Sequence, residues 1–173
     1  MFSATPTLFA RLLFGCLISV AQLAAAGDAD TVPCHTMGRW RNCVAVDLDS
    51  VSRDEAEKNF DAPQKGYAKI YIYRTTPVRP RSKSEVFLDD VALATLGVNT
   101  YAAFDITPGK HSLHVKTKDN AAIDINVEEG HRYFIDLQLE FLFWRNSERL
   151  ELTDEATAKA QIMKSRLVKK FTD

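Results

Sequence analysis

Apolar and polar side chains alternate one by one from Tyr67 onwards, in short segments separated by turn residues. A period of two residues is typical of β-strands, because successive side chains point to opposite faces of the sheet. The expected strands cover residues 67–74, 85–88, 91–96, 100–106, 111–116, 123–127, 132–137 and 148–152. No segment between them is long enough for the helix that joins two parallel neighbours. The alternation therefore predicts antiparallel strands in a sandwich or small barrel.

Turn residues lie between the expected strands. Asp89-Asp90 separates two segments that read as a β-hairpin, and Glu128-Glu129-Gly130 marks another turn. Thr107-Pro108-Gly109-Lys110 has Pro and Gly at the two central positions of a type II turn, since Pro presets φ and Gly permits a positive φ. We expect the chain to reverse direction at residues 107–110.

Two helices are expected outside the strands. Ser52 and Glu55 have the spacing of a capping box, which predicts a helix that ends near Phe60. Thr153 is a suitable N-cap for a C-terminal helix that runs to about Lys170. Its expected apolar stripe is Ala156, Ala160, Met163 and Leu167. The predicted fold class is mainly β: an antiparallel β-sandwich of the immunoglobulin or transthyretin type, with a short N-terminal helix and a C-terminal helix packed on the sheet.

Residues 1–26 have the composition of a signal peptide. They contain no acidic residue and a single Arg11, followed by an apolar run that ends in Ala24-Ala25-Ala26. Small residues at this position suit a signal peptidase, and the run is short for a membrane span. We expect cleavage after Ala26 and a periplasmic or secreted protein. The remaining chain divides into an N-terminal extension, residues 27–62, and a β-sandwich domain with the C-terminal helix, residues 63–173.

Two alternatives to cleavage remain open. Leu13-Phe14-Gly15-Cys16 loosely resembles a lipobox, which would make Cys16 a lipidated anchor to the envelope. Phe14 is bulky for that motif, and few apolar residues precede it. Retention of residues 1–26 would instead leave a membrane-tethered structural protein.

Cys34 and Cys43 are the cysteines that remain after cleavage, and they lie nine positions apart. Thiols oxidise in the periplasm, so we predict a disulfide between them that holds the N-terminal segment. A metal site on Cys34, His35 and Cys43 is the alternative, although it lacks a fourth ligand and the close cysteine spacing of common zinc sites.

Charge and motifs exclude several classes of function. The formal net charge is −1, with 22 basic and 23 acidic residues, so no uniform positive field predicts nucleic-acid binding. The nucleophile elbow, the zinc-protease motif, the phosphate-binding loop and the dinucleotide fingerprint are all missing from the sequence. Asp89-Asp90 and Glu128-Glu129 coincide with turns, where acidic residues are ordinary. We therefore expect no enzymatic activity, no cofactor and no bound metal.

A hydrolase or metal enzyme is the alternative. Its site would use His111, His131 and nearby acids. His111 and His114 lie three residues apart on one strand, hence on opposite faces, so they cannot hold one ion together.

Aromatic side chains are the candidate binding residues. Tyr71 and Tyr73 lie on one face of the first strand, where they could form a platform for a sugar or a peptide. Trp144 ends an apolar segment that extends a late strand or forms a bulge, and Trp40 lies in the predicted disulfide loop. The alternative for the tyrosines is that a helix or a neighbouring segment covers their rings.

Four different short motifs follow one another along the expected β-domain. They are IYIYR at residues 70–74, LDD followed by alternating apolar residues at 88–96, PGKHSL at 108–113 and GHRYF at 130–134. Over residues 60 to 155 this succession resembles the bacterial envelope family called domain of unknown function 2846. The resemblance implies export or lipid anchoring and a β-rich fold, and it implies no particular activity. Many relatives look like lipoproteins with a cysteine near the mature start, whereas Cys16 lies within the apolar run.

These observations favour a noncatalytic protein of the periplasm or cell envelope that binds another envelope component, either a protein or a cell-wall glycan. Membrane contact is expected only if residues 1–26 are retained or Cys16 is lipidated. The sequence names neither the ligand nor the oligomeric state.

Overall fold

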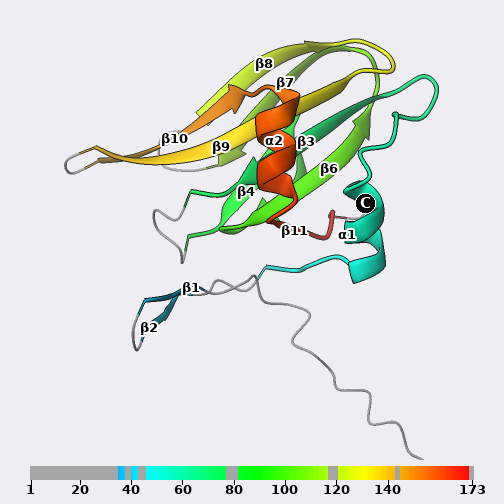
Figure 1. Ribbon diagram of the computed structural model, residues 1–173. Coiled ribbons are helices and arrows are strands. Elements are labelled where there is room, and N and C mark those ends of the chain that lie inside the picture. Colours follow the sequence, from blue (N-terminus) through cyan, green and yellow to red (C-terminus); the bar gives the residue numbers. More distant parts are fainter. Residues whose placement is uncertain are drawn as a thin grey trace, which may run out of the picture.

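The computed structural model describes residues 35–37, 40–42, 46–76, 82–116, 121–142 and 145–171. These residues form a mainly β structure with two short helices (Figure 1). Their strands make a five-stranded sheet, a four-stranded sheet and a two-stranded hairpin. Within the described ranges, no helix is long and apolar enough to cross a membrane.

The four-stranded sheet is antiparallel and has the order β5-β4-β7-β8. Its strands are β4 (Ser84–Leu88), β5 (Val91–Leu96), β7 (Gly109–Lys116) and β8 (Ala121–Val127). Asp89 and Asp90 form the turn between β4 and β5, with φ angles of 48° and 68°. Positive φ at both central positions is typical of a type I′ turn, whose twist matches that of the flanking strands. The predicted β-hairpin is confirmed.

The five-stranded sheet is mixed and has the order β10-β9-β3-β6-β11. Its strands are β3 (Ala68–Arg74), β6 (Thr100–Ile106), β9 (Arg132–Leu142), β10 (Arg145–Leu152) and β11 (Arg166–Leu167). β3 pairs with β9 in parallel, and β6 pairs with β11 in parallel. The prediction of an entirely antiparallel fold is therefore wrong. A helix is one way to bring the chain back for a parallel pair, but here the strands of the other sheet lie between β3 and β9 in the sequence and serve as the connection.

The turn at residues 107–110 does not close a hairpin. It joins β6 in one sheet to β7 in the other, and β7 pairs with β4 and β8. Gly109 has a φ of 142°, which suits glycine because it has no side chain beyond Cα. The Pro-Gly signal thus located the change of direction, whereas the pairing on either side depends on distant strands.

The two sheets share one hydrophobic core. Side chains from their facing sides form a single cluster of buried residues, including Ile70, Ile72, Phe104 and Ile135 from the five-stranded sheet, and Val86, Leu96, Leu113 and Val115 from the four-stranded sheet. Burial of apolar side chains between two layers is the main contribution to the stability of such a fold.

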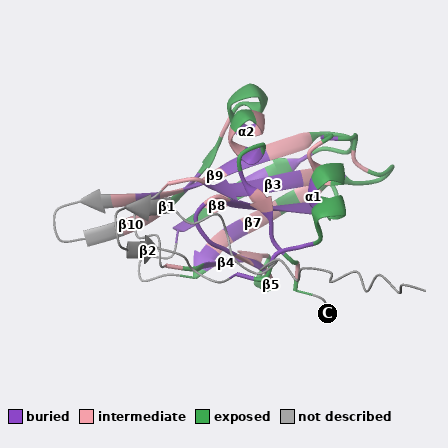
Figure 2. Cartoon of the chain, turned by 60° about the horizontal axis from the view of Figure 1, so that its bottom comes forward, coloured by how far each residue is buried: buried purple, intermediate pink, exposed green. Residues whose placement is uncertain are grey.

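A second apolar cluster lies on the other face of the five-stranded sheet, where α2 (Glu155–Ile162) crosses β9 and β3 (Figures 1 and 2). The predicted C-terminal helix on the sheet is confirmed, but it differs in its details. Asp154 rather than Thr153 is the N-cap, and the helix ends at Ile162, well before Lys170. The buried residues of α2 are Ala158 and Ile162. The predicted stripe is wrong: Ala156 and Ala160 are exposed, Met163 is 57% exposed, and Leu167 belongs to β11.

The N-terminal helix α1 (Val51–Glu57) is capped by Ser50, whose side chain accepts a hydrogen bond from Arg53 N, and not by Ser52. Its buried residue is Asp54. One carboxylate oxygen of Asp54 accepts hydrogen bonds from the Tyr101 hydroxyl (2.9 Å) and from Leu167 N (3.0 Å). The other lies 2.9 Å from Lys58 Nζ and 3.3 Å from Arg166 Nε. Asp54 therefore ties α1 to β6 and β11.

The segments before α1 and after β11 also pack against the sheets. Val46 and Leu48, which precede α1, are part of the main core. Leu48 forms a β-bridge with Val168, and Lys170 forms one with Ala94 of β5. The segment after β11 thus connects the chain before α1 to the edge of the four-stranded sheet.

Candidate functional site

The predicted aromatic platform is not a surface. Tyr71 and Tyr73 are 0% and 1% exposed, so neither ring can contact a ligand. Tyr71 stacks on Phe134 with 5.1 Å between ring centres, and Phe60 packs against Tyr71 at 5.4 Å. The alternative interpretation is what the structure shows: Phe60 and α2 cover these rings. Tyr71 and Tyr73 are therefore not accessible as binding residues.

The tyrosines on this face are structural. Burial raises the pKa of Tyr71, Tyr73 and Tyr101, so each keeps its hydroxyl proton. Tyr73 donates a hydrogen bond to Thr153 Oγ1 (3.2 Å), just before α2. None of the three is available as a base or as a metal ligand.

β9 and β10 form a long hairpin arm. In β9, residues Arg132 to Asp136 pair with β3, and residues Ile135 to Leu142 pair with β10. The outer half of the arm therefore has no partner in β3, and the arm extends past the other strands (Figures 1 and 2). Residues 143–144 connect Leu142 to Arg145 and lie outside the described residues, so the role of Trp144 stays a prediction.

The predicted disulfide also lies outside the described residues, as do Cys16, Cys34 and Cys43. Between the latter two, β1 (His35–Met37) and β2 (Trp40–Asn42) form an antiparallel hairpin. The side chain of Trp40 is outside the described part of the chain. The disulfide and the contact role of Trp40 both stay predictions.

Among the described histidines, His111 lies closest to a carboxylate, that of Asp89. Nδ1 of His111 lies 2.6 Å from Asp89 Oδ2, and Nε2 lies 2.8 Å from the Thr107 carbonyl oxygen. Asp89 Oδ1 also accepts a hydrogen bond from Ser112 N (2.9 Å). Ser112 and His111 are neighbours, but His111 has no nitrogen left to activate a hydroxyl, because both face acceptors. The pair links two turns and is not arranged as a nucleophile with its base.

The other histidines do not join it. His114 stacks on Phe87 (5.0 Å between centres) and lies 4.0 Å from Asp90. His131 is mostly exposed, 4.0 Å from Glu128. Among the described residues, no three His, Cys, Asp or Glu side chains are grouped closely enough to hold a metal ion. The structure therefore does not bring His111 and His131 together, and the hydrolase alternative gains no support from the described residues.

Arg74 was not singled out from the sequence, yet its side chain is fully buried at the end of β3. It donates hydrogen bonds to the Ser82 carbonyl oxygen (2.8 Å) and to Ser82 Oγ (2.9 Å). Ser84, next to it, donates to Glu148 Oε1 (3.3 Å) on β10. A buried guanidinium with such partners holds the start of β4 against the other sheet.

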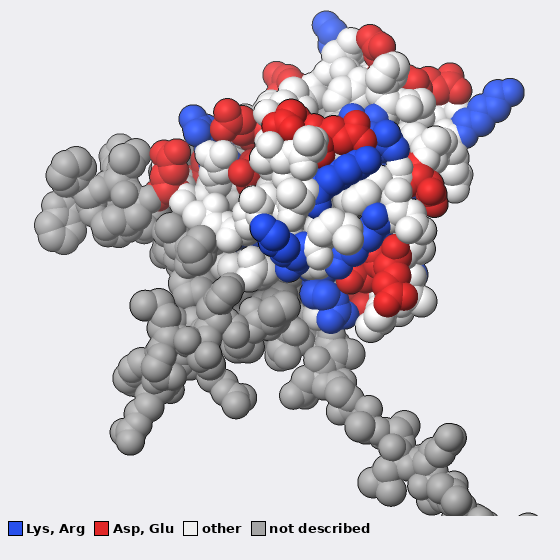
Figure 3. Space-filling view, in the orientation of Figure 1, with Lys and Arg blue, Asp and Glu red and all other residues white. Residues whose placement is uncertain are grey.

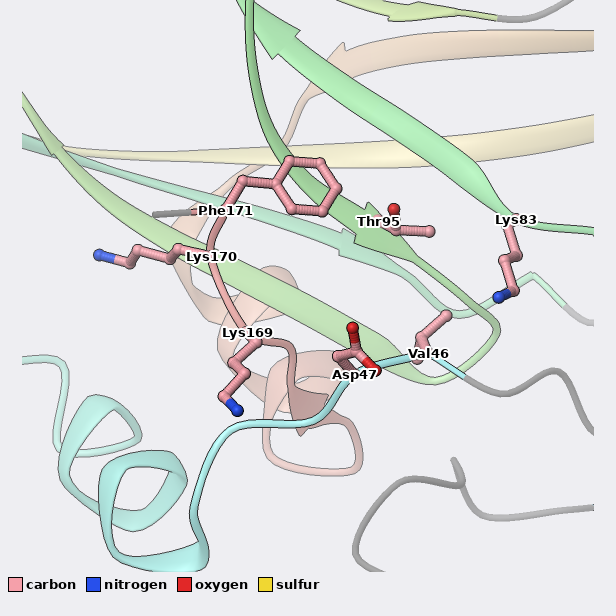
Figure 4. Close-up of a pocket in the computed structure, with 7 residues that line it drawn as sticks. All are labelled: Val46, Asp47, Lys83, Thr95, Lys169, Lys170 and Phe171. Atoms are coloured by element: carbon pink, nitrogen blue, oxygen red, sulfur yellow. The ribbon is translucent and has the colours of Figure 1, made fainter. Parts of the chain in front are cut away.

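A hollow of about 160 Å³ was also missed by sequence reasoning (Figure 4). Segments far apart in the sequence form it, since Val46 and Asp47 precede α1, Lys83 precedes β4, and Lys169 and Phe171 follow β11. In Figure 4, Lys83 and Lys169 lie on either side of Asp47. The Lys170 side chain points away, with its amine 5.3 Å from the centre of the Phe104 ring, and burial lowers its pKa. The amines do not converge on one point, so the hollow is not shaped around an anion.

Basic and acidic side chains are interspersed over the face seen in Figure 3. This mixed surface agrees with the small net charge of the chain. The expectation that no nucleic acid binds stays a prediction.

Residues 64–146 match the protein family described as "Protein of unknown function (DUF2846)". A relative described as "Uncharacterized protein", from Haemophilus influenzae, is 27% identical over 123 residues, which cover 70% of this chain and 73% of the relative. Residues 64–146 therefore form a domain of this family, as the four motifs indicated. The domain spans β3 to the start of β10 and so contains most of both sheets.

Proposed function

We propose that this chain is a noncatalytic binding or accessory protein of the cell envelope, exported by residues 1–26, and that it contacts its partner through the end of the β9–β10 arm. The partner is another envelope component, a protein or a cell-wall glycan. The chain is periplasmic or secreted, with lipidation of Cys16 as the alternative. The single observation that carries the proposal is the arm itself.

The arm extends beyond the other strands, and its sequence near the end is apolar. Its base is fixed, because Leu137, Leu139 and Leu150 are buried in the main core. Its outer part pairs only within the hairpin. From the end of β9 into the connection, the sequence runs Phe141-Leu142-Phe143-Trp144, four large apolar residues in succession. Clusters of large apolar residues are typical of interaction sites where they lie on a surface, and tryptophan is enriched among residues that carry binding energy.

The polar groups of the described body support a binding role over a catalytic one. Asp54, Arg74 and the Asp89–His111 pair are each held by several internal partners. A catalytic acid or base must be free to meet a substrate. These groups instead join different elements of the fold to one another.

We also propose a specific fold class for the described body. The shared core supports a β-sandwich of the immunoglobulin or transthyretin type, in a version whose larger sheet is mixed.

The test is cross-linking in intact cells. A photoreactive amino acid at position 144 of the full chain is expected to capture one envelope protein, or to attach the chain to sedimented cell-wall material. The same group in place of Leu152, which is 50% exposed at the other end of β10, is the matched control and should capture neither. Trp144→Ala should abolish co-purification of the partner, whereas Leu152→Ala should leave it intact. Equal products from both positions, or none from position 144, would refute the proposal.

A further inference from the structure

The turn between β4 and β5 depends on contacts from outside it. Asp89 and Asp90 both have positive φ, a conformation that residues other than glycine adopt at a cost. Asp89 N donates to the Ser112 carbonyl oxygen (2.9 Å), and Asp89 Oδ1 accepts from Ser112 N (2.9 Å). Asp89 Oδ2 faces His111 at 2.6 Å. The turn is therefore held against β7 chiefly by one aspartate.

The contacts of His111 require two protons on its ring. Nδ1 faces a carboxylate and Nε2 faces the carbonyl oxygen of Thr107, and both of these groups can only accept when Asp89 is ionised. A neutral imidazole has one N–H, so it satisfies one of the two contacts and turns a lone pair toward the other. The doubly protonated ring satisfies both. It then joins the β4–β5 turn to the connection between β6 and β7.

Both acidic and basic side chains surround His111. On the β4–β5 turn, Asp89 is in contact and Asp90 lies near His114. On β7 and β8, Lys110 and Asp124 line the same open hollow of about 500 Å³ as His111. Burial of the ring by itself lowers the pKa of His111, but the hydrogen bonds to Asp89 and to Thr107 O and the charge of Asp89 outweigh it, so the pKa is raised above 6.5. The hydrogen bond from His111 lowers the pKa of Asp89 below 3.8.

We propose that the β4–β5 turn is a pH-dependent element, closed by the protonated His111–Asp89 pair and released when His111 loses its proton. Release changes the shape of the hollow that Asp89, His111 and Asp124 line, so that this surface differs between acidic and alkaline surroundings. The inference does not depend on the arm or on its partner.

The sign follows from the direction of the two shifts. Because the pKa of His111 is raised on folding, its contribution is complete below about 6.5 and is lost as the pH rises through the folded value. Because the pKa of Asp89 is lowered, its contribution is present above about 3.8 and is lost as the pH falls through the folded value. The turn is thus held most firmly between these two limits.

The experiment is amide hydrogen exchange of the full chain, followed by NMR at Asp89 and Ser112 between pH 5.5 and 8.5 and corrected for the intrinsic exchange rate. Protection at both amides is expected to fall by up to about fivefold across the titration of His111, the range for an ion pair near the surface. His111→Gln, which donates one hydrogen bond and does not titrate, should show the low protection at every pH. His131→Gln removes a mostly exposed imidazole and should behave as the unmodified chain.

Titration of the His111 ring in the same samples completes the test. Its pKa should lie above 6.5, and Asp89→Asn should lower it. The proposal is overturned if protection at Asp89 and Ser112 does not change with pH, if His111→Gln keeps the same pH dependence, or if His111 titrates below 6.5.

Discussion

Asp54→Asn is the perturbation that most directly tests how α1 is held. The substitution keeps the shape of the side chain and removes its charge. The remaining amide oxygen can still accept from the Tyr101 hydroxyl and from Leu167 N. In the unsubstituted chain, Lys58 Nζ and Arg166 Nε lie 2.9 and 3.3 Å from the second carboxylate oxygen of Asp54. In the variant, the amide nitrogen takes the place of that oxygen, so an N–H donor faces two other N–H donors.

The expected loss in the free energy of unfolding is about 2–4 kcal/mol. Removing one partner of a buried ion pair costs about 3–5 kcal/mol, because the other charge stays buried without compensation. Lys58 and Arg166 keep 15% and 32% of their side chains exposed, and Lys58 also donates to the Ser165 carbonyl oxygen. Water and that carbonyl offset part of the penalty, which places the loss below the upper limit.

Urea denaturation of the full chain measures this loss. With an m-value of about 2 kcal/mol per M, the midpoint should fall by about 1–2 M. Glu55→Gln removes the same charge from an exposed position of the same helix and should change the stability by less than about 0.5 kcal/mol. If the two variants lose the same amount, Asp54 does not hold α1 on β6 and β11, and the reasoning is wrong.

Two further predictions concern the second apolar cluster, and calorimetry or urea denaturation checks both. Tyr71→Ala should destabilise the fold by about 3–5 kcal/mol because it opens a cavity beside Phe134, whereas Tyr71→Phe should cost less than about 1 kcal/mol; similar losses for the two would show that the hydroxyl, and not the ring, matters. Ile162→Ala should cost about 2–5 kcal/mol and Met163→Ala less than about 0.5 kcal/mol, since one side chain is buried under α2 and its neighbour is exposed. The reverse order would restore the apolar stripe expected from the sequence.

The strands were predictable from local alternation, but their pairing was not. In β3, Ile70 and Ile72 point into the main core, while Tyr71 and Tyr73 point into the second cluster, so both faces are buried. A strand buried on both faces lies in the middle of a sheet, and its neighbours are set by distant contacts. The sequence shows the alternation of residue types. It does not show that the hydroxyl-bearing face is covered.

The helices were misplaced for a related reason. Ser50 and Ser52 are both suitable N-caps, and only Ser52 has a glutamate three positions later. Thr153 and Asp154 are likewise both good N-caps. Local signals therefore allow two registers in each case. Tertiary contacts select one of them: burial of Asp54 against Tyr101 for α1, and burial of Ala158 and Ile162 for α2. Helices of seven and eight residues have little stability of their own, so these contacts decide their limits.

Three polar groups whose structural contacts were not predicted from the sequence share one physical role. Asp54 joins α1 to the segment after α2, Arg74 joins the end of β3 to the start of β4, and Asp89 joins a hairpin turn to β7. The contacts of Asp54 and Asp89 join residues 113 and 23 positions apart, whereas that of Arg74 spans only 8. The entropy lost in closing each loop must be offset by the contact and by the apolar burial around it. Asp54 and Arg74 are buried, whereas Asp89 is half exposed and lines the open hollow beside His111. The proposed contact with a partner therefore stays with the β9–β10 arm, whose outer part pairs only within the hairpin and extends past the other strands.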